Sequence, residues 1–137
     1  MKILVVSLFL LACSICHAQS RLSVTLVCEG EQKDRIPICL ACREPYIYSS
    51  THESKTYTFN NNQLVAMNGS SFSGSDFTCD ISEESITCEK TGYGGVDILR
   101  INRISGSASR IIKYRDHNSM EATHVFSGLC KVGTRQF

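Results

Sequence analysis

Six cysteines follow residue 18, and they are the side chains of this chain best suited to chemistry: Cys28, Cys39, Cys42, Cys79, Cys88 and Cys130. Cys39 and Cys42 form a C-x-x-C pair, a spacing found in redox dithiols and in zinc knuckles. A redox dithiol needs a lowered thiol pKa, usually from a helix N-terminus in a βαβ unit, and the sequence indicates no such unit. The nine-residue step from Cys79 to Cys88 does not fit a second zinc knuckle. We therefore expect disulfides, with no metal and no cofactor.

The positions of these cysteines predict their partners. Cys28 is in phase with the apolar side chains of the first expected strand, and Cys130 is in phase with Phe126 in the last. Pairing of the first and last strands would bring these two thiols together inside the protein. Cys79 and Cys88 flank an acidic turn, so a hairpin would place them opposite each other. Elimination leaves Cys39 with Cys42, one set among the 15 connectivities that six cysteines allow.

The other reactive side chains lie outside recognisable catalytic motifs. His52 and His117 lie in expected polar turns, and His124 alternates with Thr123 and Val125 in the last expected strand. None belongs to a nucleophile or zinc-protease motif. The acidic run at residues 80–84 is typical of a solvated hairpin tip. We expect no catalytic residue and a non-catalytic protein, while a small secreted enzyme, either a hydrolase or a thiol oxidoreductase, stays open as an alternative.

The N-terminus has the pattern of an export signal. Lys2 precedes an apolar run at residues 3–12, and Cys16 and Ala18 place small side chains before a cleavage site. This pattern predicts a signal peptide at residues 1–18, a mature domain at residues 19–137, and a periplasmic or secreted location. A lipoprotein cut before Cys13, with a lipid anchor on that residue, is the alternative. It would leave Cys16 as an unpaired thiol, whereas the even count after residue 18 suits an oxidising compartment.

Charge and hydropathy narrow the classes of partner that the protein is suited to bind. Without Lys2 the chain has 13 basic and 13 acidic side chains, so the mature protein is neutral when its histidines are neutral. A neutral chain is poorly suited to nucleic acid, which requires a surplus of Lys and Arg. No second apolar run approaches the ~20 residues of a transmembrane span. We expect the partner to be an unknown protein or a small ligand of the cell envelope.

The mature chain reads as short strands separated by turns rich in Gly, Ser and Asn. We expect about eight strands and no helical body. Residues 30–45, which contain both prolines, are expected to be irregular, and residues 46–48 and 56–59 to be two strand pieces on either side of a polar turn. The predicted fold is all-β, a single antiparallel barrel or sandwich that disulfides hold together.

Barrel mouths and hairpin tips are the expected contact surfaces of such a fold. They correspond to the segments 68–75, 92–95 and 105–109, with the neighbouring arginines. The candidate binding residues are Tyr93, Arg103, Ser105, Gly106 and Arg110.

Two stretches carry a resemblance to known proteins. The segment from Ile101 to Gly106 and the segment from Gly128 to Cys130 give an I-x-R-x-[ST]-G … G-x-C ending. This ending resembles that of small uncharacterised proteobacterial exported β-barrel proteins, which implies an envelope location and brings no activity. Ser105-Gly106 in a hairpin turn is also similar to the C-type lysozyme inhibitors, whose Ser-Gly loop enters the lysozyme cleft. That resemblance implies an inhibitor of a cell-wall hydrolase as an alternative function.

Overall fold

The computed structural model describes residues 23–68, 70–71, 76–92 and 94–136. The expected signal peptide, the alternative lipid site at Cys13 and the candidate residue Tyr93 lie outside the described residues. Nine strands make up the described fold: β1 (Ser23–Pro37), β2 (Tyr46–Asn60), β3 (Gln63–Met67), β4 (Ser70–Ser71), β5 (Thr78–Ile81), β6 (Ser85–Gly92), β7 (Gly95–Asn102), β8 (Ser107–Arg115) and β9 (Glu121–Gln136). No helix occurs in the part of the chain that the structure describes.

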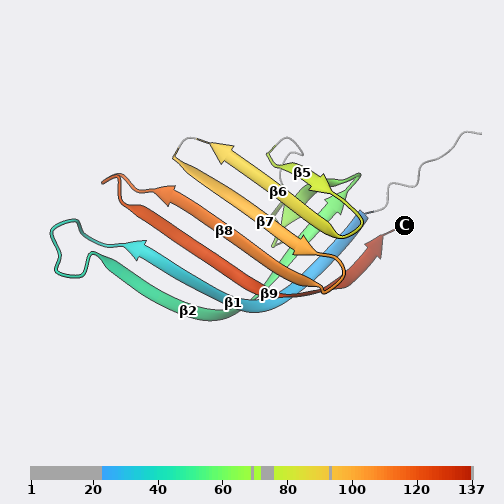
Figure 1. Ribbon diagram of the computed structural model, residues 1–137, viewed down its shortest axis with the longest axis horizontal. Helices are drawn as coiled ribbons and strands as arrows, with labels where there is room; N and C mark the ends of the chain where they lie inside the picture. The colour runs from blue at the N-terminus through green and yellow to red at the C-terminus, as the bar shows by residue number, and fades with distance from the viewer. Residues whose placement is uncertain (1–22, 69, 72–75, 93, 137) are drawn as a thin grey trace, which may run out of the picture.

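All strands belong to one antiparallel sheet in the order β4-β3-β2-β1-β9-β8-β7-β6-β5. Two meanders, β1 to β4 and β5 to β9, are joined where β1 pairs with β9. The sheet curls strongly, so that β3 approaches β5 and a nearly closed barrel results (Figure 1). This arrangement confirms the predicted all-β, antiparallel, barrel-like fold.

The two ends of the barrel differ. At the closed end lie the turns between β2 and β3, β5 and β6, and β7 and β8. At the open end the long hairpin of β1 and β2 extends beyond its neighbours (Figure 1). Asn61 and Asn62 make the β2–β3 turn with φ of 49° and 62°. Two consecutive positive φ values are what a tight two-residue hairpin turn requires, and asparagine tolerates them.

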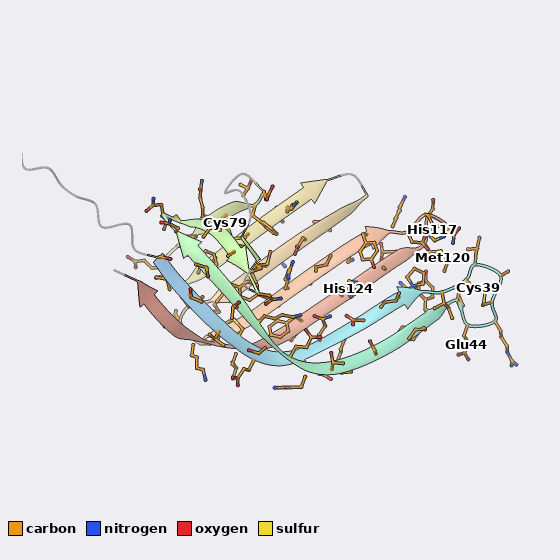
Figure 2. The ribbon with its side chains drawn as sticks, turned by 180° about the vertical axis from the view of Figure 1, so that it is seen from behind. Cys39, Glu44, Cys79, His117, Met120 and His124 are labelled. Carbon is orange, nitrogen blue, oxygen red and sulfur yellow. A yellow bond between two sulfur atoms is a disulfide. The ribbon has the colours of Figure 1, made fainter. Side chains whose placement is uncertain are left out.

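Three cysteine pairs connect the sheet, and they are the pairs that the sequence predicts. Cys28 and Cys130 face each other across β1 and β9 with their Cα atoms 3.9 Å apart. Cys79 pairs with Cys88 across β5 and β6, and Cys39 pairs with Cys42 at the tip of the β1–β2 hairpin (Figure 2). Three disulfides suggest an oxidising compartment outside the cytoplasm.

A layer of apolar side chains fills the barrel on its concave face. Its fully buried members are Cys28, Tyr57, Leu64, Cys88, Leu99, Ala122 and Phe126, each at most 2% exposed. The ring of Phe126 lies over Gly128, where an added Cβ would come within 2.8 Å of Cζ. Gly30 faces Gly128 from β1, and an added Cβ on Gly30 would come within 2.4 Å of the Gly128 Cα, so this glycine pair lets β1 and β9 approach closely.

Two expectations about the first hairpin were wrong. β1 continues through residues 30–37, which we expected to be irregular, and β2 is one continuous strand where we expected a polar turn. The cause is the open end of the barrel. There both faces of the hairpin carry polar side chains, so the apolar alternation that marks a half-buried strand is missing although the backbone pairing persists.

Candidate functional site

The closed end of the barrel holds a cavity of about 960 Å³. Its lining comes from β1, β2, β5, β6, β7 and β9 and from the β2–β3 and β7–β8 turns, so strands far apart in the sheet order contribute to one cavity. The apolar lining side chains are Val24, Leu26, Phe59, Ile81, Ile86, Ile101, Cys130 and Val132. We call this region the apolar half of the concave face. Several of these side chains remain partly exposed, and Val132 is 52% exposed.

Polar groups surround the mouth of this cavity. They belong to two turns at the closed end and to β9: Asn61 and Asn62 of the β2–β3 turn, Asn102, Arg103 and Gly106 at the β7–β8 turn, and Lys131 of β9. Such a combination of an apolar interior with a few polar groups at the rim is the usual composition of a site for small molecules.

The β7–β8 turn is held rigidly by its own hydrogen bonds. The side chain of Asn102 accepts hydrogen bonds from the amides of Ile104 and Ser105 at 3.0 and 2.8 Å. Gly106 has a φ of 74°, and its carbonyl accepts from the amide of Cys130 at 2.7 Å. The turn is thereby tied to the strand that carries the central disulfide.

Arg103 and Gly106, two of the candidate residues from the sequence, therefore line the cavity, and the candidate Ser105 precedes Gly106 in the same turn. Arg103 also donates from Nη1 to the carbonyl of Ser82, which links the β7–β8 turn to the β5–β6 turn. Ser105 and Ser107 share a hydrogen bond of 2.9 Å between their hydroxyls. Ile104, next to them, is 77% exposed.

Arg110, the fourth described candidate, lies elsewhere. It points from the middle of β8 to the concave face, where Nε and Nη2 donate to the two carboxylate oxygens of Asp97 at 2.9 and 2.6 Å. Both side chains are largely buried, at 16% and 17% exposed. Burial alone would lower the pKa of Arg110, but the hydrogen bonds and negative charge of Asp97 outweigh it and raise the pKa.

Arg110 belongs to a second region, the polar half of the concave face, which we define by three pairs of a carboxylate with a basic side chain. They are Asp97–Arg110, Glu53–Lys55 and Asp34–His124. The pairs lie on the open side of the layer formed by Phe126 and Tyr57. In the third pair, Asp34 and His124 face each other across β1 and β9, and Nδ1 of the imidazole is 2.8 Å from the carboxylate.

Asp34 has several hydrogen-bond partners in addition to the histidine. Gln32 Nε2 donates to Oδ1 at 3.0 Å, and the hydroxyl of Ser49 donates to Oδ2 at 3.3 Å. Burial raises the pKa of Asp34, but the hydrogen bonds from His124 and Gln32 lower it further and leave it below the ordinary value. His124 in turn stacks on Tyr114, with ring centroids 5.6 Å apart.

Tyr57 marks the boundary between the two halves. Its side chain is fully buried, and its hydroxyl makes no hydrogen bond with any described residue, although it lies close to Arg110. Burial raises the pKa of this phenol to about 12. The tyrosine is therefore neutral at any physiological pH.

The open end carries a different surface. Around the Cys39–Cys42 pair the hairpin exposes several large apolar side chains: Ile36, Ile38, Leu40, Ile47 and Tyr48. His52 and His117 are exposed, in agreement with the expected solvated positions. Figure 2 shows His117 and Met120 at this end and His124 nearer the middle of the sheet.

Sequence reasoning missed the polar half, yet the sequence contained a signal for it. The pairing of Cys28 with Cys130 fixes the register of β1 against β9. Counting six residues onward from Cys28 and six residues back from Cys130 places Asp34 opposite His124, on the same face as the disulfide. The pair was thus encoded by the cysteine positions, but residues 30–45 were not expected to be a strand.

Among the described residues, no helix has the length and apolar character needed to cross a membrane. Within the same residues, no three or more His, Cys, Asp or Glu side chains gather into a potential metal site. A scan against protein-family models, a search of curated proteins and a search of solved structures each found no match. The two family resemblances therefore stay predictions, and the function must be argued from the site itself.

Proposed function

We propose that the protein is a non-catalytic binding protein whose apolar half takes a small, mainly apolar ligand with a polar end. The cavity of about 960 Å³ at the closed end is the observation that supports this proposal. Its size lies within the usual range of ligand sites, ~300–1,000 Å³.

The lining explains which chemistry would be bound. Apolar side chains such as Leu26, Ile81 and Ile101 surround the interior, so an apolar group gains about 25 cal/mol for each Å² that it removes from water. The amides of Asn61 and Asn62 and the guanidinium of Arg103 offer hydrogen bonds only at the rim. A ligand that is apolar along its length and polar at one end would satisfy both parts.

Location forms part of the same proposal. We infer that the protein works outside the cytoplasm, in the periplasm or after secretion, because three disulfides need an oxidising compartment. The export pattern at residues 1–18 supports the same location. Its ligand would then be a component of the cell envelope or of the surrounding medium.

Two tryptophan variants on β9 test the proposal. Val132 lines the cavity and Leu129, three residues earlier and 66% exposed, does not. Binding of N-phenyl-1-naphthylamine, an apolar fluorescent probe, is measured with excitation beyond the tryptophan absorption band. We expect Val132→Trp to weaken probe binding at least tenfold by filling the cavity, and Leu129→Trp to change it less than twofold.

The wild-type protein contains no tryptophan, so the introduced side chain reports its own surroundings. Its emission should be blue-shifted in Val132→Trp and typical of water in Leu129→Trp. Absence of probe binding by the wild-type protein, or equal weakening in both variants, would contradict the proposal.

One observation favours a second candidate, an inhibitor of a cell-wall hydrolase. The β7–β8 turn combines a rigid backbone with the exposed side chain of Ile104, and a rigid exposed turn loses little conformational freedom when it enters a cleft. A lysozyme inhibition assay tests it. Inhibition by the wild-type protein that falls at least tenfold in Ser105→Ala would support this function, and the absence of inhibition would exclude lysozyme as the target.

A further inference from the structure

A second pocket, of about 230 Å³, lies in the polar half of the concave face. Six residues from four strands line it: Gln32, Lys55, Arg110, Ile112, His124 and Phe126. Its volume corresponds to about eight water molecules at ~30 Å³ each. The packed layer that contains Phe126 and Tyr57 separates it from the cavity at the closed end.

We propose that this pocket binds the carboxylate of a small organic acid, with Gln32, Lys55 and Arg110 around the anion and the apolar part of the ligand against Ile112. This site is distinct from the apolar cavity. It would give the protein a second ligand of different chemistry.

The placement of the acidic and basic members of the three pairs carries the argument. Lys55, Arg110 and His124 line the pocket, whereas their partners Glu53, Asp97 and Asp34 do not. Each pair thus presents its basic member to the pocket and holds its carboxylate outside the lining. A ligand placed there meets hydrogen-bond donors on several sides.

These donors have capacity to spare. Arg110 uses Nε and Nη2 on Asp97, which leaves part of its five N–H groups available. Gln32 donates one of its two amide hydrogens to Asp34. Lys55 carries three donors, and its side chain is only 12% exposed, so water competes little for them. A carboxylate supplies the acceptors that these donors lack, and such charge-assisted hydrogen bonds are the strong ones.

The floor of the pocket selects an organic acid over an inorganic anion. Phe126 is buried, with its ring beneath Lys55, whose Nζ is 6.0 Å from the ring centroid. Ile112 adds a second apolar surface. A free phosphate would leave the partly buried Ile112 without an apolar partner, whereas an aromatic or aliphatic acid covers it.

Retention of the ion pairs also needs a reason beyond stability. Replacing a buried ion pair by apolar side chains is often neutral or stabilising, because the charges lose their hydration on burial. The apolar half shows that this same concave face accommodates apolar side chains. A ligand that uses the basic members explains why three pairs remain in the polar half.

Benzoate is a suitable probe, measured by isothermal titration calorimetry with the disulfide-bonded protein. Lys55→Gln should weaken benzoate binding at least tenfold. Lys33→Gln is the matched control, since Lys33 also neighbours a carboxylate, with Nζ 3.3 Å from Glu31, but its side chain is 67% exposed and lines neither cavity. We expect the control to change the affinity less than twofold.

Two further ligands test which features of benzoate, the charge or the ring, the pocket requires. Benzamide has the same ring without the charge, and inorganic phosphate has charge without a ring. Both should bind at least tenfold more weakly than benzoate. Phosphate binding equal to that of benzoate would overturn the assignment to an organic acid.

Ile112→Phe provides a second variant that leaves the ion pairs intact, in case Lys55→Gln does not fold. It narrows the pocket and should also weaken benzoate binding at least tenfold. The proposal is overturned if the wild-type protein does not bind benzoate, or if Ile112→Phe binds it as the wild type does. It is also overturned if Val132→Trp, at the closed end, abolishes benzoate binding, because the anion would then occupy the other cavity.

Discussion

The two halves of the concave face are built on the same strands but from opposite side chains. β1, β2, β8 and β9 run through both halves. Around Cys28 and Cys130 they carry apolar residues, while around Asp34 and His124 they carry ion pairs. Backbone pairing continues unchanged from one half to the other. The strands therefore extend as far as their backbones pair, whatever side chains they carry. The chemistry of each half is set by the side chains that point to the concave face there.

This contrast separates stability from binding. We expect the apolar half to supply most of the stability, because it contains the buried layer and the disulfide between the first and last strands. The polar half should contribute little stability and most of the electrostatic specificity. The predictions below test this division, starting from the largest effect.

Loss of the central disulfide should have the largest effect. Cys28 and Cys130 are 102 residues apart, and closing a loop of that length is worth about 4–5 kcal/mol on the chain-entropy model. The double variant Cys28→Ala/Cys130→Ala should lose about that much free energy of unfolding, measured with urea. The disulfide between Cys39 and Cys42 closes a loop of only three residues. The corresponding double variant, which lacks that disulfide, should therefore lose about 2 kcal/mol of unfolding free energy. Equal losses of stability in the two double variants would contradict the division into a stabilising apolar half and a polar half that contributes little stability.

The Asp97–Arg110 pair should show that the polar half can be made apolar without loss of stability. Arg110→Met alone leaves a largely buried carboxylate without its partner and should cost about 2–3 kcal/mol. The double variant Asp97→Leu/Arg110→Met should regain the wild-type value within about 1 kcal/mol. The comparison is made by urea unfolding at one pH. A double variant as unstable as the single one would show that the pair itself stabilises the fold.

Acid should remove the contribution of Asp34. Its pKa in the folded protein lies below 3.8, the ordinary value, so its ionised form stabilises the fold above that pH. The contribution is lost as the pH falls below 3.8 through the lower folded pKa. Asp34→Asn should therefore be less stable than the wild type at pH 7, and the difference should shrink as the medium becomes more acid than pH 3.8. A difference independent of pH would contradict this assignment.

Tyr57→Phe should have the smallest effect. The phenol hydroxyl is buried without a hydrogen bond to any described residue, so removing it removes a desolvated group and no described contact. We expect a change within about 1 kcal/mol, neutral or stabilising, in thermal or urea unfolding. A loss of more than that would indicate that the hydroxyl has a partner after all.

Much of the fold could be predicted from the sequence, because local signals were clear in the apolar half. Apolar residues alternate around Cys28, which indicated the first strand, and the turn between Cys79 and Cys88 indicated a hairpin. These signals led to two of the disulfides, and elimination led to the third. The open end of the β1–β2 hairpin lacked those signals. Gln32 and Asp34 point inward, but their polar side chains look like those of surface residues in the sequence. Alternation of apolar and polar residues identifies a strand only when one of its faces is apolar.

The candidate site was predicted in part. Arg103, Ser105 and Gly106 were selected as a turn, and the structure places Arg103 and Gly106 in the lining of a cavity that no local pattern could reveal. That cavity depends on strands that lie far apart in the sheet order, such as β2 with Phe59 and the edge strand β5 with Ile81, which only the curled sheet brings together. Arg110 was grouped with the turn by sequence proximity, but strand β8 carries it to the polar half.

A two-dimensional nuclear magnetic resonance titration of the ¹⁵N-labelled protein with N-phenyl-1-naphthylamine tests the central claim most directly. The account predicts that the amide signals of the apolar half, such as those of Ile81, Ile101 and Val132, shift with saturating dependence on probe concentration. Signals around Lys55 and Arg110 should stay in place. Shifts confined to the polar half or to the tip around Cys39, or no shifts at all, would contradict it.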